Sequence, residues 1–139
     1  AADPEGDHRP RTELPEFLAK LKQTVTELAR VGVQPVLMTL PPIDGARYLD
    51  YICRGGLSRD SIMRWLGDVG CIYRYQELYS DTVASFAMRE GLPLIDVRRR
   101  FLPQRDLSEL ISADGIHLTM PGYRQLFDTL AQWVVPQLA

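Results

Sequence analysis

Residues 33–40 read Val-Gln-Pro-Val-Leu-Met-Thr-Leu and are followed directly by Pro41 and Pro42. A short and nearly continuous apolar run of this kind is typical of a strand that is covered on both faces, as in a parallel sheet. Residues 92–97, Leu-Pro-Leu-Ile-Asp-Val, form a second run of the same type. The two runs therefore predict two buried parallel strands, and these decide the fold class.

Helical patterns surround both runs. Apolar residues recur at spacings of three and four between Thr12 and Gly32, between Cys71 and Gly91, and after Pro121. A short helix is also expected near residues 107–111. Strands that alternate with helices indicate an α/β protein with a parallel sheet.

Residues 43–70 are rich in glycine and aromatic side chains. We expect this segment to form an excursion at the carboxyl end of the first strand, with one short helix capped by Ser58. Its aromatic residues Tyr48, Tyr51 and Trp65 have two interpretations. They belong to the core, or they line a substrate pocket, because the segment lies above the strand ends where α/β proteins bind ligands.

The composition is that of one globular domain. The 139 residues are 45% hydrophobic and carry 16 Lys and Arg against 18 Asp and Glu, which gives a net charge of −2. A near-neutral chain lacks the basic surface with which proteins grip phosphates, so nucleic acid is not an expected partner. No apolar stretch approaches the roughly 20 residues that span a bilayer.

Two strands do not make a complete sheet of this type. Both would lie at edges, yet strands this apolar need neighbours on both sides. We expect the missing strands to come from absent amino-terminal sequence, from another chain, or from a strand that the pattern does not reveal. The expected fold is a three-layer, flavodoxin-like α/β domain, of which residues 1–139 form the carboxyl-terminal part.

The stretch Asp114-Gly115-Ile116-His117-Leu118-Thr119 carries the candidate chemistry. An Asp three residues before a His, in a glycine-containing turn, can hold the imidazole through Nδ1–H and leave Nε2 free as a general base. The alternative is a turn in which the Asp caps local amides and the His is simply exposed. Short motifs of this kind also occur by chance.

The stretch DGIHLTMPGY, residues 114–123, resembles the last conserved block of the SGNH hydrolases, also called GDSL-type esterases and lipases. LAKLKQTVTELARVGVQPVLMTLPPI, residues 18–43, is similar to a helix and strand of that family. LYSDTVASFAMREGLPLIDV, residues 78–97, is similar to the helix and strand that follow. The resemblance covers residues 14–138, so residues 1–139 are expected to be one domain of this kind.

The resemblance implies that His117 is the general base of an esterase and that Asp114 orients it. It implies an acyl-enzyme mechanism without a metal or organic cofactor, acting on an acetylated carbohydrate, a short-chain ester or a lysolipid. The family's Gly-Asp-Ser nucleophile motif and its oxyanion-hole Asn do not occur in these 139 residues. We therefore expect the nucleophile to lie outside this chain and the chain alone to be inactive. A competing interpretation is a non-catalytic binding or interaction domain that retains the fold.

Other residues admit a chemical interpretation as well as a structural one. Arg98, Arg99 and Arg100 form a solvated turn or an anion site, and the lack of a wider basic patch favours the turn. Asp96 lies at the carboxyl end of a strand, where α/β proteins form ligand sites, or it stabilises the next turn.

No zinc site is expected, because no known ligand spacing fits the two His and two Cys, which are His8, Cys53, Cys71 and His117. No serine is expected to be a nucleophile, because all are assigned to helices or helix caps: Ser58, Ser61, Ser80, Ser85, Ser108 and Ser112.

Overall fold

The computed structural model describes residues 10–138, so His8, named above for the zinc-ligand spacing, lies outside the described residues. The elements in chain order are α1 (Leu14–Arg30), β1 (Leu37–Met38), α2 (Gly45–Arg54), α3 (Arg59–Leu66), α4 (Gly70–Glu90), β2 (Leu94–Ile95), α5 (Arg98–Phe101), α6 (Leu107–Leu110), α7 (Met120–Val134) and the 3-10 helix η1 (Val135–Gln137). The predicted α/β class is confirmed. No helix in the described part of the chain is both long and apolar enough to cross a membrane.

Both predicted strands are present and they pair in parallel. Leu37 lies opposite Leu94 and Met38 opposite Ile95. The hydrogen bonds that flank this register run from Leu37 N to Pro93 O at 2.9 Å and from Thr39 N to Ile95 O at 3.1 Å. Each strand has only two residues and is shorter than its apolar run, because Pro35 and Pro93 have no N–H with which to extend the ladder.

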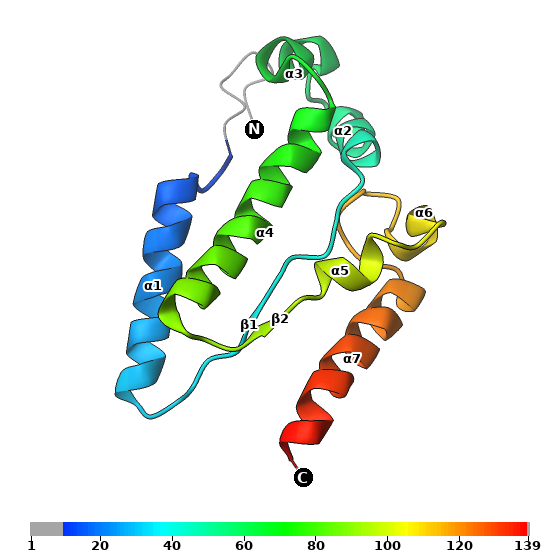
Figure 1. Ribbon diagram of the computed structural model, residues 1–139. Coiled ribbons are helices and arrows are strands. Elements are labelled where there is room, and N and C mark those ends of the chain that lie inside the picture. Colours follow the sequence, from blue (N-terminus) through cyan, green and yellow to red (C-terminus); the bar gives the residue numbers. More distant parts are fainter. Residues whose placement is uncertain (1–9, 139) are drawn as a thin grey trace.

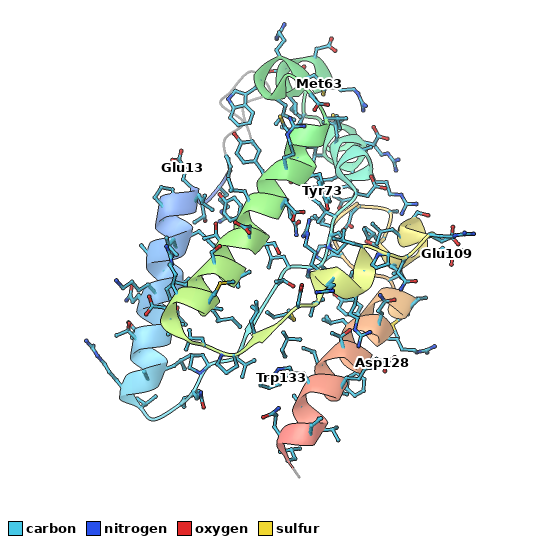
Figure 2. The ribbon with its side chains drawn as sticks, in the orientation of Figure 1. Glu13, Met63, Tyr73, Glu109, Asp128 and Trp133 are labelled. Carbon is cyan, nitrogen blue, oxygen red and sulfur yellow. The ribbon has the colours of Figure 1, made fainter. Side chains whose placement is uncertain are left out.

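Helices lie on both sides of the two strands. α4 contacts β1 and β2, α7 contacts β2, and α1 packs beside α4. Figure 1 shows the strands between α4 and α7, with α1 on the side of α4. Trp133 projects from α7 toward the strands (Figure 2), where it packs with other α7 side chains against the buried cluster Ile95, Val97 and Phe101. The core is therefore built around β2 and the turn that follows it.

The excursion between β1 and α4 contains two helices, whereas the sequence pattern predicted one. The predicted helix is α3, and the Ser58 hydroxyl caps it by accepting a hydrogen bond from Ser61 N. The additional helix is α2, which begins after Asp44, whose side chain accepts a hydrogen bond from Arg47 N. Burial of Leu49 anchors α2 to the rest of the domain, since this side chain is fully inaccessible to solvent.

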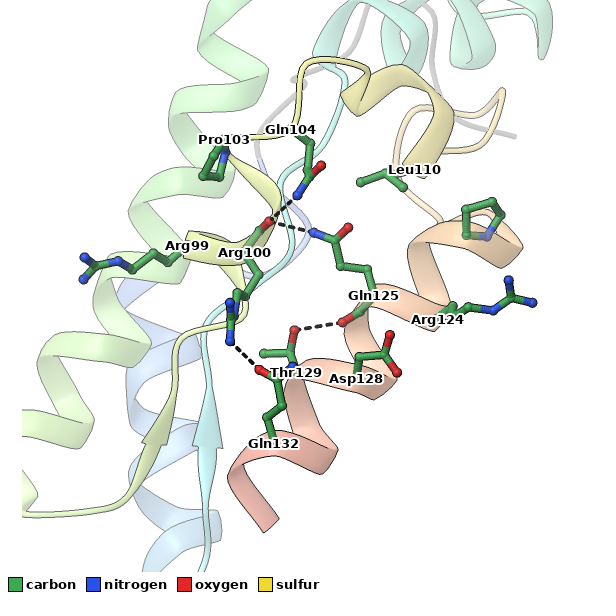
Figure 3. A pocket seen from close by; sticks show the side chains of 11 residues that line it. Arg99, Arg100, Pro103, Gln104, Leu110, Arg124, Gln125, Asp128, Thr129 and Gln132 are labelled. Carbon is green, nitrogen blue, oxygen red and sulfur yellow. Dashed lines mark hydrogen bonds between the residues drawn. The ribbon is translucent and has the colours of Figure 1, made fainter. Parts of the chain in front are cut away.

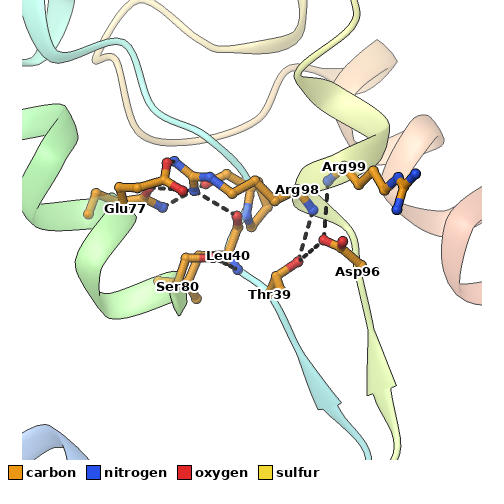
Figure 4. Close-up of polar contacts among 9 residues, drawn as sticks. Thr39, Leu40, Glu77, Ser80, Asp96, Arg98 and Arg99 are labelled. Carbon is orange, nitrogen blue, oxygen red and sulfur yellow. Dashed lines mark hydrogen bonds and ion pairs between the residues drawn. The ribbon is translucent and has the colours of Figure 1, made fainter. Parts of the chain in front are cut away.

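The prediction of a solvated turn at Arg98–Arg100 is wrong in two respects. These three residues begin the short helix α5, and Arg98 is only 5% exposed, whereas Arg99 and Arg100 do face solvent. Figure 4 shows its guanidinium reaching from the start of α5 to α4 and to the end of β1. Nη2 lies 2.5 Å from Glu77 Oε2, and Nη1 donates to Leu40 O at 3.0 Å and to Gln76 Oε1 at 2.7 Å. Arg98 faces inward because its side chain reaches acceptors at the end of β1 and on α4.

Candidate functional site

Residues 112–117 form a tight loop between α6 and α7. Ile111 and Leu118 form an isolated antiparallel bridge at its base. Two backbone hydrogen bonds close it, from Ser112 N to His117 O at 2.8 Å and from Thr119 N to Leu110 O at 3.0 Å. The backbone of the candidate motif is therefore held at both ends.

Gly115 fits the loop onto the amino-terminal end of α2. Its φ is +81°, and a Cβ placed there would lie 2.4 Å from Tyr48 N and 2.5 Å from Asp44 O. Gly115 O accepts a hydrogen bond from Asp44 N at 2.8 Å. Only glycine tolerates both the left-handed conformation and this close approach of two backbones.

The Asp114 carboxylate organises the loop and also contacts the imidazole. Oδ1 accepts hydrogen bonds from Ser112 Oγ at 2.6 Å, from Ile116 N at 3.0 Å and from His117 N at 3.0 Å. Oδ2 lies 2.5 Å from His117 Nδ1. The side-chain hydrogen bond with His117, followed by those from Ser112 and the backbone, holds the pKa of Asp114 well below its usual range. The carboxyl group is therefore ionised at neutral pH.

His117 presents its other nitrogen to solvent. The imidazole side chain is 70% exposed, whereas the Asp114 side chain is 18% exposed. A neutral ring that donates from Nδ1 to a carboxylate carries its lone pair on Nε2. Within residues 10–138, Nε2 makes no hydrogen bond, so it is free to accept a proton from a hydroxyl group. The hydrogen bond predicted between Asp114 and His117 is thus present.

The loop lies at the carboxyl end of the strands. β1 runs into the segment that leads to α2, and the loop sits on the first turn of α2 through Gly115 and Asp44. Figure 1 shows α2 and the loop beyond the same end of the strands. Ligands of open α/β sheets bind at this end of the strands.

Arg47 joins α2 to the segment before the loop, a role that the sequence pattern does not reveal. Its Nη1 donates to Ser108 O and to Ile111 O, both at 2.8 Å, and its Nε lies 3.4 Å from Asp44 Oδ2. The Asp44 cap could have revealed α2, because Asp is a favoured residue before a helix. The two carbonyl partners lie more than 60 residues away, and no local pattern points to them.

The serines do not supply a nucleophile at Nε2 within the described residues. Ser112 lies in the loop itself and not in a helix or cap, so its predicted placement is wrong. Its hydroxyl donates to Asp114 Oδ1 and thereby helps to orient the carboxylate. Ser80 is buried in α4, where its Oγ accepts a hydrogen bond from Leu40 N at 3.1 Å. The loop position of Ser112 follows from the bridge at Ile111, which ends α6 one residue earlier than expected.

Asp96 has the structural partners of a turn residue. Its Oδ1 accepts hydrogen bonds from Thr39 Oγ1 at 3.0 Å and from Arg99 N at 3.2 Å, which joins the ends of β1 and β2 (Figure 4).

Cys53 and Cys71 are free thiols. In residues 10–138 no three His, Cys, Asp or Glu side chains gather in a way that could hold a metal ion.

A polar groove of about 530 Å³ lies between α5 and α7 (Figure 3). Leu110 and Pro121 at its rim flank the candidate loop, but Asp114 and His117 do not line it. Several of its polar groups form hydrogen bonds with one another. Gln125 Nε2 donates to Arg100 O at 2.6 Å, and the Arg100 guanidinium donates to Gln132. These contacts join α5 to α7, so we assign the groove a structural role.

Comparison with known proteins supports the fold. No family model and no curated protein matches the chain. The chain is similar to the crystal structure of a lipase/acylhydrolase from Enterococcus faecalis, with a TM-score of 0.65 and 16% sequence identity. The match covers 96% of this chain and 57% of that structure, so the chain spans little more than half of the neighbour's length. At this identity the likeness establishes a shared fold: the chain has the α/β architecture of part of a hydrolase structure.

Proposed function

We propose that this chain is the carboxyl-terminal part of a serine ester hydrolase of the SGNH, or GDSL, type. The single observation that carries the proposal is the contact of 2.5 Å between Asp114 Oδ2 and His117 Nδ1, with Nε2 open to solvent. The location of this pair at the carboxyl end of the strands supports it, as does the fold shared with a lipase/acylhydrolase. Asp114 and His117 are the proposed acid–base pair of the active site.

In the proposed reaction a serine outside these residues attacks the carbonyl carbon of an ester. His117 Nε2 takes the hydroxyl proton as the serine oxygen bonds to carbon, and the ionised Asp114 stabilises the resulting imidazolium. The imidazolium then gives its proton to the leaving alcohol as the tetrahedral intermediate collapses to an acyl-enzyme. Water, activated by the same nitrogen, hydrolyses the acyl-enzyme in a second round. Donors for the oxyanion also belong to the segment outside this chain.

The open sheet supports the idea that the domain continues beyond this chain. In residues 10–138 β1 pairs with β2 and with no other strand, so each strand leaves one edge unpaired, whereas sheets of this type usually have four to six strands. We infer that the remaining strands of a flavodoxin-like, three-layer sheet add along a free edge of this pair of strands. The segment that supplies them would also bring the nucleophile to the carboxyl end of the sheet, where His117 lies.

The test is hydrolysis of p-nitrophenyl acetate by the natural polypeptide that carries this sequence and its upstream segment. His117→Ala and Asp114→Asn should each lower kcat by about 10²–10⁴-fold, because a general base or its orienting carboxylate is lost. His8→Ala is the matched control, since His8 is the chain's other histidine and is expected to leave kcat unchanged. Full activity of His117→Ala would remove this residue from the mechanism. An upstream segment without a Gly-Asp-Ser motif would favour a non-catalytic binding domain.

A further inference from the structure

An apolar cavity of about 390 Å³ lies among α2, α3 and the first turns of α4. Ligand pockets typically have volumes of about 300–1,000 Å³ and are lined mainly by apolar and aromatic side chains. The cavity fits this description, because among the described residues that line it Arg11 alone is charged. These residues are Pro10, Arg11, Tyr48, Ile52, Leu57, Ile62, Trp65, Leu66, Ile72 and Tyr75.

The cavity adjoins the proposed active site through α2. Tyr48 lines it, and Tyr48 N is the backbone atom against which Gly115 packs. Gly115 lies between Asp114 and His117 in the chain. Its carbonyl oxygen accepts a hydrogen bond from Asp44 N, at the start of α2. One turn of α2 therefore borders both the catalytic loop and the cavity.

The walls of the cavity are suited to a flexible apolar chain. Ile62, one of the lining residues, is only 3% exposed. Trp65 and Tyr75 are partly exposed, and their rings stack with centroids 6.3 Å apart. Of the aromatic residues that the sequence offered as pocket-lining, Tyr48 and Trp65 line the cavity, whereas Tyr51 lies outside it on the exposed face of α2.

We propose that this cavity binds the acyl group of the ester, and that the preferred substrate carries an unbranched acyl chain longer than acetyl. The inference rests on the proposed function, because it assumes that the ester carbonyl lies at His117. The apolar tail then extends past Tyr48 into the cavity, while the alcohol leaves on the solvent side. Within residues 10–138, no charged partner for a sugar phosphate or a lipid headgroup lines the cavity apart from Arg11, which favours the acyl end of the substrate as the occupant.

Chain-length dependence tests the proposal in the polypeptide that includes the upstream segment. The substrates are the p-nitrophenyl esters of acetate, butyrate, hexanoate and octanoate. Each methylene that is buried should raise kcat/KM about fourfold, until the cavity is full. Leu57→Trp narrows the cavity and should lower the octanoate-to-acetate ratio of kcat/KM at least about tenfold. Tyr51→Trp, on the exposed face of α2, is the matched control and should keep the wild-type ratio. Ile52→Phe is a second narrowing variant in case Leu57→Trp does not fold, as judged by circular dichroism.

A binding measurement separates this inference from the proposed function. Saturation-transfer NMR with octanoate and with acetate reports contact between a ligand and protein methyl groups without any turnover. We expect octanoate to bind wild type and Tyr51→Trp, and to bind Leu57→Trp at least about tenfold more weakly. Octanoate binding of this pattern in a protein without esterase activity would refute the proposed function and leave the cavity assignment standing. Efficient hydrolysis of acetate, with no preference for longer chains and no octanoate binding, would refute the cavity assignment alone.

Discussion

Asp114 Oδ2 lies 2.5 Å from His117 Nδ1, and the other oxygen of the same carboxylate accepts the backbone N–H of His117. One side chain thus fixes both the backbone and the ring of the candidate base. The rotation of the imidazole is restricted before any substrate binds, which is the kind of preorganisation that proton transfer requires. The consequences of this arrangement can be measured in stability as well as in activity.

The ionised carboxyl group of Asp114 should stabilise the fold in a pH-dependent manner. Its pKa is lowered in the folded chain from the unfolded value of 3.8, so its contribution is fully present above about pH 5 and is lost as the pH falls below 4 toward the folded pKa. Asp114→Asn should therefore destabilise the protein at pH 7, and the difference from wild type should shrink at pH 3. Urea denaturation at the two pH values measures this difference. Asp128→Asn, at an exposed position of α7, serves as control, and an equal difference for Asp114→Asn at both pH values would contradict the expectation.

Substitution of Gly115 should cost more than substitution of a glycine with the same backbone conformation elsewhere. Gly91 also has a positive φ, of +64°, but nothing lies within 4 Å of a Cβ there. Gly91→Ala should lower the free energy of unfolding by about 1–2 kcal/mol through strain alone. Gly115→Ala should cost about 1–3 kcal/mol more, because its methyl group would overlap the backbone of α2. Guanidinium denaturation of both variants measures the loss in free energy of unfolding. Equal losses for Gly91→Ala and Gly115→Ala would mean that the loop moves away from α2 without a cost.

Arg47 should act as a positioning residue for the loop. Arg47→Ala removes both hydrogen bonds to Ser108 O and Ile111 O, and we expect a loss of about 1.5–3 kcal/mol of stability because these bonds involve a charged donor. In the active polypeptide kcat should fall more than KM rises, since misplacement of His117 affects the reacting atoms more than substrate binding. Arg47→Lys should recover only part of the stability, because an ammonium cannot reproduce the fork of a guanidinium. A change in KM alone would argue against positioning.

The ion pair between the buried Arg98 and the half-exposed Glu77 should be sensitive to the loss of its acid. Glu77→Gln leaves the guanidinium with its two neutral acceptors, Leu40 O and Gln76 Oε1, but without a countercharge. We expect a destabilisation of about 1.5–3 kcal/mol, because the Arg98 side chain is buried and cannot recover its hydration. Asp81→Asn, at an exposed position of the same helix, is the control and should change stability by less than about 0.5 kcal/mol. Thermal denaturation compares the two variants.

The hydrophobic pattern was sufficient to predict the strands and most helices. The apolar runs at residues 33–40 and 92–97 contain β1 and β2, and the helical periodicities locate α1, α4 and α7. The pattern missed α2, since glycine and aromatic residues obscured its periodicity and its only clear signal was the Asp44 cap. It also placed Arg98 in solvent, because charge alone carries no information about which acceptors lie within reach of a long side chain.

By itself the sequence determined the local features of this protein: parallel strands, the flanking helices, and an Asp and a His three residues apart in one turn. These follow from short-range physics, because periodicity, capping and turn chemistry act within a few residues. Only the tertiary structure decided what surrounds the turn. The packing of Gly115 on α2 and the hydrogen bond from Arg47 to Ile111 O each join segments more than 60 residues apart. These segments meet because burial of the β2 core brings α2 and the loop to the same end of the strands.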